Sequence, residues 1–252
     1  MAKQQDIKWK RLAIEAAAIV ASILLAFAID AGWDERQERA EETEVLESLY
    51  VEFEANRDAA AAVILFHDRV VQSVVELMEL SEEEILGLQA NAVVDFLSVL
   101  GNPRTFDAVR GSVDALISSG KLGILRDREL RESLTTFVNI VDDSVEDANY
   151  LSQSSITIWN EIARSGGPWR TKADLLSAEE CSGPRPDKNC YTNDALSFLP
   201  LATPEDLLTL RNNTVLMGYV YQEKVNAVHY LAEVRQAEIQ IEIVLKLIEK
   251  NL

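Results

Sequence analysis

An almost unbroken apolar run occupies residues 12–31, between a basic stretch and a group of acidic residues. As a helix rising ~1.5 Å per residue, the part from Leu12 to Ile29 is roughly 27 Å long, enough to cross a thin hydrocarbon core. Trp9 and Trp33 lie at its two ends, where amphipathic rings favour the headgroup layers of a bilayer. The pattern predicts one transmembrane helix over residues 12–31, with Trp9 and Trp33 as interface anchors.

The residues before the span set its expected orientation. They include Lys3, Lys8, Lys10 and Arg11. Because short basic segments beside a span tend to stay in the cytoplasm, we expect residues 1–11 inside the cell and residues 32–252 outside. The expected location is the bacterial inner membrane, with the main domain in the periplasm. A cleaved signal peptide is the alternative, since residues 26–28 (Ala-Phe-Ala) satisfy the small-residue rule for cleavage, although the apolar run continues past them.

Three later stretches repeat apolar residues at alternating steps of three and four, a pattern typical of coiled coils and helix bundles. The first continues the membrane helix to about Leu80, the second begins at Asp127 and ends before residues 166–168, and the third covers about Asn213 to Lys250. The seam positions are Leu46, Leu49, Phe53, Asn56, Ala60, Val63, His67, Val70, Val74 and Leu77; Leu130, Leu134, Phe137, Val141, Ser144, Ala148, Leu151, Ser155, Ile158 and Ile162; and Leu216, Val220, Glu223, Ala227, Tyr230, Val234, Ala237, Ile241, Val244 and Ile248.

Shorter helices are predicted between the long ones. Ser81 followed by three glutamates indicates a helix start, and this helix would cover residues 82–100, ending at the Gly-Asn-Pro of residues 101–103. Residues 105–118 read as a further compact helix. Residues 203–206 (Thr-Pro-Glu-Asp) begin another, because proline suits the first helical position and acids suit the first turn.

These elements predict an all-α fold in which the N-terminal transmembrane helix continues into an elongated antiparallel helical bundle. The three long helices would each be near ~55 Å in length. No alternation typical of a strand occurs over a useful length. Residues 32–252 are therefore expected to form one helical domain outside the cytoplasm.

Composition adds a strongly acidic surface to this picture. The chain has 24 Lys and Arg against 42 Asp and Glu, a formal net charge of −18, and the excess lies after Trp33. Such a surface repels nucleic acid, which is excluded as a partner. The only cysteines, Cys181 and Cys190, flank a segment with two prolines and a glycine. In an oxidising compartment they predict a disulfide in a loop near residues 167–200.

Candidate chemistry is sparse. His67 and His229 fall inside amphipathic stretches without a second ligand at helical spacing, so no metal site is predicted. The sequence contains no nucleophile elbow, phosphate-binding glycine loop or dinucleotide fingerprint. We therefore expect no cofactor and no catalytic residue, and the chain is not expected to be an enzyme.

Glu15 is an ionisable carboxyl one turn inside the apolar span, which is costly unless it is paired, reaches the interface or meets a partner. One interpretation is pairing with Arg11 in the basic stretch. The other is a contact with a partner helix, because small residues allow close approach of two backbones. The candidate membrane-helix contact residues are Glu15, Ala17, Ala18, Ala21 and Ser22.

Two segments resemble an uncharacterised family of bacterial single-pass membrane-anchored helical proteins. The first comprises Glu15, Ala26, Asp30 and Trp33-Asp34-Glu35-Arg36; the second comprises Thr105-Phe106-Asp107, Leu116-Ile117-Ser118-Ser119-Gly120-Lys121-Leu122, Ile124-Leu125-Arg126-Asp127 and Glu129-Leu130-Arg131. The resemblance covers about the first 140 residues and implies an N-terminal anchor, a helical exterior domain and no agreed activity. It carries over Glu15, Trp33, Ser119 and Gly120.

The expected function is that of a membrane-anchored structural or interaction protein of the envelope. Its expected partners are the lipid bilayer and either further copies of the chain or another inner-membrane protein. A periplasmic ligand-sensing bundle that signals through a partner membrane protein is the alternative. Buried polar groups around a cavity would favour the sensor, and an exposed apolar stripe would favour assembly.

Overall fold

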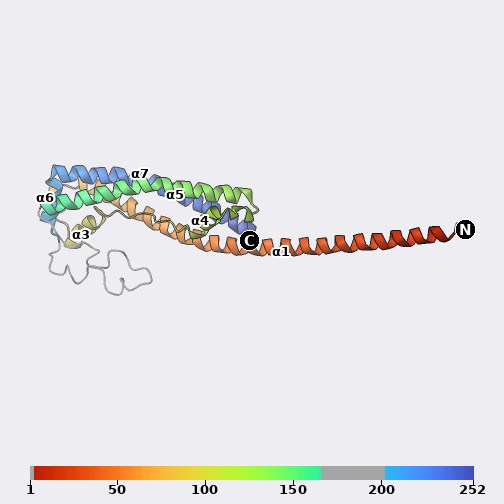
Figure 1. Cartoon of the computed structure of the whole chain (residues 1–252). Coiled ribbons are helices and arrows are strands. Elements are labelled where there is room, and N and C mark those ends of the chain that lie inside the picture. Colours follow the sequence, from red (N-terminus) through yellow and green to blue (C-terminus); the bar gives the residue numbers. More distant parts are fainter. Residues whose placement is uncertain (1–2, 166–201) are drawn as a thin grey trace, which may run out of the picture.

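The structure is a computed structural model that describes residues 3–165 and 202–252. Within these residues its regular structure is all helical and contains no strand, which confirms the predicted all-α class. Helix α1 (Lys3–Glu79) runs without a break, as predicted, to within one residue of Leu80. Figure 1 shows that its C-terminal half packs with the other helices while its N-terminal half projects away from them.

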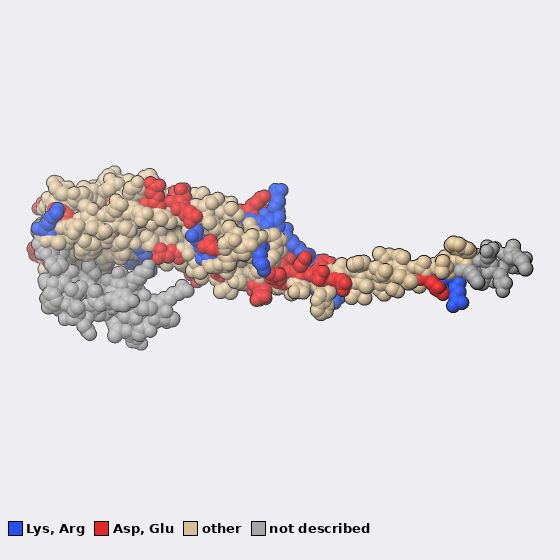
Figure 2. Space-filling model, viewed as in Figure 1, with Lys and Arg blue, Asp and Glu red and all other residues tan. Residues whose placement is uncertain are grey.

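The projecting half of α1 contains the apolar run. Among the described residues, α1 holds the one stretch long and apolar enough to cross a membrane, judged by length and composition alone, and none of this stretch is buried against the rest of the chain. In Figure 2 it forms a mostly uncharged rod beside a body with many acidic side chains. We use the word body for the packed helices from Glu35 onward.

Two further long helices, α5 (Arg128–Arg164) and α7 (Thr214–Asn251), pack along each other, and α7 also packs along α1. Their ends meet through side chains. Lys250 and Asn251 at the end of α7 contact Asp127 at the start of α5, and Asn213 before α7 contacts Glu161 near the end of α5. The predicted seams of α1 and α7 are buried throughout, and in α5 only Ala148 is half-buried.

Polar side chains begin these helices at the predicted places. Asp127 accepts hydrogen bonds from the backbone amides of Glu129 and Leu130 at the start of α5. Asn213 does the same at the start of α7, and Thr203 caps α6 (Pro204–Asn212) with Asp206 in a reciprocal capping box. Each cap satisfies amides that a helix leaves without an internal partner.

Two of the predicted shorter helices differ from the structure, one by a break inside it and the other at its start. The single helix predicted over residues 82–100 is divided into α2 (Glu82–Leu86) and α3 (Ala90–Val99), because α2 ends at Gly87 and α3 restarts after Gln89. The helix predicted over residues 105–118 begins only at Gly111, as α4 (Gly111–Ser118), followed by the 3-10 turn η1 (Lys121–Ile124). Residues 102–110 are not helical.

The buried apolar side chains form two clusters. The larger one surrounds Phe53, Phe137 and Tyr230 and extends toward the end of the body from which α1 projects. The smaller one, with Ile85 and Leu207, lies at the opposite end, where α2 and α3 contact α6. We call that opposite end the distal end. The predicted disulfide between Cys181 and Cys190 lies outside the described residues.

Candidate functional site

The predicted contact residues of the membrane helix all lie on the projecting part of α1. Arg11 Nε lies 3.1 Å from Glu15 Oε1, so the pairing considered from the sequence is present. Ser22 donates its hydroxyl to the Ala18 carbonyl at 2.8 Å and so satisfies itself within the helix. The residues Glu15, Ala17, Ala18, Ala21 and Ser22 are exposed, and so are the rings of Trp9 and Trp33. A partner for this helix stays a prediction.

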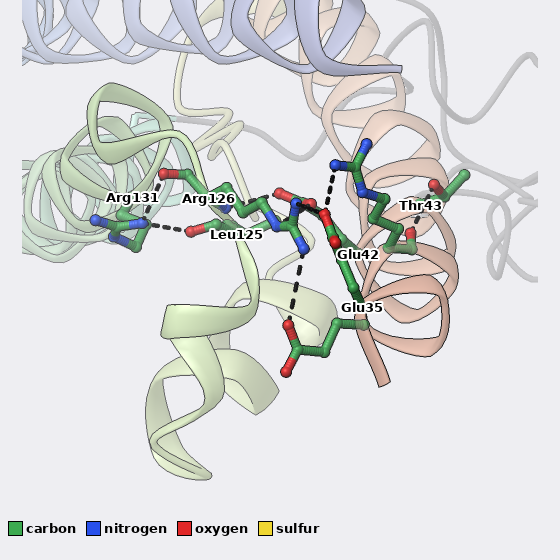
Figure 3. Close-up of polar contacts among 8 residues, drawn as sticks. Glu35, Glu42, Thr43, Leu125, Arg126 and Arg131 are labelled. Carbon is green, nitrogen blue, oxygen red and sulfur yellow. Dashed lines mark hydrogen bonds and ion pairs between the residues drawn. The ribbon is translucent and has the colours of Figure 1, made fainter. Parts of the chain in front are cut away.

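The body begins immediately beyond Trp33, at a group of ion pairs that we call the junction. The Arg126 guanidinium lies 3.9 Å from Glu35, 3.7 Å from Glu38 and 3.5 Å from Glu42, and the Arg126 backbone amide donates to Glu42 at 2.7 Å. Figure 3 shows Arg126 reaching from the loop after η1 to α1. One arginine therefore contacts successive turns of α1 where that helix leaves the body.

Neighbouring residues hold this arginine in place. Arg131 donates to the carbonyls of Leu125 and Arg126 from the first turn of α5, as Figure 3 shows. Glu35 also accepts from Arg39 at 2.7 Å, and this hydrogen bond is the main cause that lowers the pKa of Glu35. The start of α5 and the exit of α1 are thus joined by side chains from both elements.

Asp127, the next residue, joins the same place to the end of α7. Its carboxylate caps α5 and also accepts from Asn251 at 3.1 Å and from Lys250 at 3.3 Å. The Asn251 hydrogen bond is the largest of the causes that lower its pKa to about 2. Asp127 is therefore ionised at neutral pH, and all three long helices are linked at the end of the body nearest the apolar span.

A shallow groove of about 420 Å³ lies beside the junction, between α1 and α4. Its apolar wall includes Val45, Ala115 and Leu116, and Glu41 and Lys121 pair across it at 3.1 Å. Ser119, carried over from the family resemblance, lines the same groove. Gly120 beside it has a φ of +69°, in the left-handed region that glycine adopts without strain, which ends α4 and allows the turn into η1.

The second unusual feature is the non-helical stretch of residues 101–110, which we call the clasped segment. Asn56 on α1 binds Val109 at both backbone groups, accepting from its amide at 2.7 Å and donating to its carbonyl at 2.8 Å. His67, also on α1, donates Nε2–H to the Arg104 carbonyl at 2.7 Å. Two polar exceptions of the α1 seam therefore hold backbone groups that a helix would have bonded internally.

Helix α7 holds the clasped segment from its own side. The Tyr230 hydroxyl accepts from the Phe106 amide at 2.6 Å, and Glu223 Oε1 accepts from the Gly101 amide at 2.8 Å. Just past the segment, Glu52 accepts from the amides of Ser112 and Val113 and so caps α4. Five buried polar side chains from α1 and α7 thus bind the backbone between residues 101 and 113.

Burial shifts the pKa values of the clasping groups. His67 is almost fully buried, and desolvation lowers its pKa in spite of the Arg104 hydrogen bond, so its ring is neutral. Desolvation raises the pKa of Glu223 to about 8 and that of Tyr230 to about 12. Since charged forms are disfavoured in an apolar environment, His67, Glu223 and Tyr230 bind the segment in their neutral forms at neutral pH.

The sequence pointed to only part of this arrangement. Asn56 and His67 are the two polar residues of the seam predicted for α1, and both are buried, whereas His229 on α7 is exposed. The clasped segment was expected to be largely helical, and Glu223 was placed in a seam without a role. A carboxylate in an otherwise apolar seam was the available signal, because buried charges require partners.

Within the described residues, no three His, Cys, Asp or Glu side chains are grouped so that they could hold a metal ion. Comparison of the chain with protein-family models, with curated proteins and with solved structures finds no match. The resemblance drawn from the sequence therefore stays a prediction.

Proposed function

We propose that this protein is a membrane-anchored, non-enzymatic structural or interaction protein of the bacterial envelope. The observation that carries the proposal is the contrast within α1: its C-terminal half packs in the body, and its apolar N-terminal half is exposed and not buried by any other described part of the chain. An exposed apolar surface of this length requires lipid or a partner. The bilayer satisfies that requirement along all sides of the helix.

The proposed topology places residues 1–11 in the cytoplasm and the body in the periplasm. The basic residues before the span and the acidic body after it support this orientation. We further infer an elongated antiparallel bundle, since the end of α7 meets the start of α5, and Arg211, in the last turn of α6 just before α7, donates to the Met78 carbonyl near the end of α1. The junction would then lie at the outer surface of the membrane and the distal end farthest from it.

Alkaline extraction of native membranes tests the anchor. Leu24→Arg places a charge in the middle of the span, where insertion scales assign a cost of about 2.5–3.5 kcal/mol, and we expect this variant to shift into the carbonate-soluble fraction. Leu65→Arg is the matched control, because Leu65 is similarly exposed on α1 but lies in the part of that helix that belongs to the body. If carbonate removes the unaltered protein from membranes, the proposal is wrong.

Self-assembly through the membrane helix is the second part of the proposal. The small residues Ala17 and Ala21 share one side of α1, and Ile23 points to the opposite side, since two residues turn a helix by about 200°. A photo-crosslinking amino acid at position 21 should give a dimer or a crosslink to another membrane protein, and one at position 23 should not. Equal yields, or monomer only at both positions, would contradict assembly through this face.

A sensor that signals through a partner membrane protein is the second candidate, and the junction favours it. Arg126 connects the loop before α5 to the turns of α1 that follow the apolar span, so a displacement of α5 would reach the anchor. The polar groups buried between the helices, however, bind the clasped segment of the chain itself. Assembly therefore remains the first proposal.

A further inference from the structure

Glu223 is the most unusual buried group in the body. Its side chain is 3% exposed, only Oε1 has a hydrogen-bond partner, and Oε2 is buried without one. A carboxylate in such a place is normally paired with a cation or bound by several donors. Within residues 3–165 and 202–252, one backbone amide, that of Gly101, is the single hydrogen-bond partner of this carboxyl.

Position 101 has a backbone conformation and a close neighbour that favour glycine over any other residue. Its φ is +66°, and a Cβ atom at this residue would lie 2.6 Å from Trp159 Nε1. Its carbonyl accepts from that indole at 2.9 Å and also from the Ser155 hydroxyl, both on α5. Gly101 is therefore fixed between α5, through its carbonyl, and α7, through its amide to Glu223.

Among the described residues, no charged side chain stabilises the ionised form of Glu223. The clasped segment contributes the Gly101 amide, which is neutral. The α5 side chains that bind Gly101, Ser155 and Trp159, are neutral as well. Burial raises the pKa of Glu223 and the Gly101 amide alone lowers it, so within the described residues no charged side chain of α1, α5 or the clasped segment contributes.

We propose that Glu223 makes the clasped segment a pH-responsive strap, which the protonated side chain holds closed at Gly101 and the ionised side chain releases. An ionised carboxylate with a single donor would gain free energy by admitting water, and the least costly route is to displace residues 101–103. The remaining clasps at Arg104, Phe106 and Val109 do not depend on Glu223, so the release is confined to the Gly101 end.

The release would act on the distal end of the body. Helix α3 ends at Val99, two residues before Gly101, and Leu97 and Leu100 pack in the smaller apolar cluster with Ile158 and Val220. Freeing Gly101 removes a connection between α3 and the two long helices α5 and α7. Alkaline conditions would therefore loosen the end of the body that lies farthest from the apolar span.

Hydrogen-exchange mass spectrometry of the full chain in detergent micelles tests the strap, with rates corrected for intrinsic exchange. Between about pH 6 and about pH 9, we expect protection of the peptide around Gly101 to fall about tenfold or more. A peptide covering Val109 and Val113, which Asn56 and Glu52 hold, should keep its protection and serves as the internal control. The measurement needs no membrane, so its outcome is independent of the proposed anchor.

Glu223→Gln is the decisive variant, since the amide side chain retains the acceptor for Gly101 and cannot ionise. Its protection around Gly101 should not change with pH, whereas Glu233→Gln, at a more exposed carboxyl on α7, should behave like the unaltered chain. A constant protection in the unaltered chain, or the same loss in Glu223→Gln, would overturn the proposal. If Glu223→Gln does not fold, infrared titration of the unaltered chain tests the proposal instead. The carbonyl stretch of a protonated carboxylic acid should persist at neutral pH and disappear above about pH 8. Absence of this band at neutral pH would equally overturn the proposal.

Discussion

Asn56 binds Val109 through both of that residue's backbone groups, with the amide 2.7 Å from Oδ1 and the carbonyl 2.8 Å from Nδ2. The side chain thus imitates the pairing of a neighbouring strand for one residue of the clasped segment. Because Asn56 is fully buried in the α1 seam, no water replaces these bonds if the amide is removed. The relationship explains how a polar residue occupies an apolar seam.

Replacing Asn56 by leucine should destabilise the body. The substitution leaves the Val109 amide and carbonyl without their partner, and each unsatisfied buried group costs about 1–3 kcal/mol. Urea unfolding should show a loss of about 3 kcal/mol in the free energy of unfolding. Asn139→Leu, at an exposed site on α5, is the control and should change it little. A loss no larger than that of the control would show that the clasp at Val109 adds no stability.

Stability should fall as the pH rises from about 4.5 to about 8. The pKa of Glu223 is about 8 in the folded protein and near 4.5 in an unfolded chain, so the folded state binds more protons in this window. The free energy of unfolding therefore decreases with pH, by a few kcal/mol across the window. Denaturant unfolding at a series of pH values measures it, and Glu223→Gln should remove most of the dependence. A pH-independent stability in the unaltered chain would contradict the prediction.

Below pH 6.5, His67 should have the opposite effect, so that its contribution to the free energy of unfolding increases with pH. Burial lowers its pKa below the ordinary value of 6.5, so the unfolded chain binds the proton more readily. Stability contributed by the neutral ring is present above pH 6.5 and lost as the pH falls toward the folded pKa. His67→Gln should flatten this part of the profile, and His229→Gln, at an exposed site, should not. Identical profiles for both variants would rule His67 out as the cause.

Arg126→Ala should loosen the junction more than it destabilises the body. The ion pairs of Arg126 are partly exposed, and such pairs contribute about 0–1 kcal/mol. The loss should appear as faster hydrogen exchange in the turns of α1 around Glu38, about tenfold. Arg128→Ala removes a comparable pair with Glu132 within α5 and is the matched control. Equal exchange in the two variants would mean that Arg126 does not fix the exit of α1.

The periodic part of the fold was predictable because it depends on local sequence. Steps of three and four place Phe53, Phe137 and Tyr230 on one side of their helices, and these side chains are buried. Asp127 and Asn213 could be recognised as helix starts because capping involves residues two or three positions away. The break between α2 and α3 and the start of α4 at Gly111 differ from the prediction, and at the start of α4 the backbone is bound by Asn56 and Glu52 of the distant helix α1.

The candidate sites illustrate the same division. The span and its ends follow from composition, whereas the pairing of Arg126 with Glu35, Glu38 and Glu42 joins residues more than eighty positions apart. Residues 105–110 have no local signal that forbids a helix. The backbone of residues 104–110 is not helical because Asn56, His67 and Tyr230 bind its amides and carbonyls in place of the next helical turn.

The sequence by itself determined the all-helical class, the long unbroken α1 with its apolar half, and the faces that the long helices bury. Hydrophobic periodicity and capping act over a few residues, so they can be read without knowing the fold. Only the tertiary structure decided that residues 101–110 remain outside any helix and that Glu223 is buried against Gly101. Those features arise from side chains that meet backbone groups far away in the chain, where local propensity no longer decides the conformation.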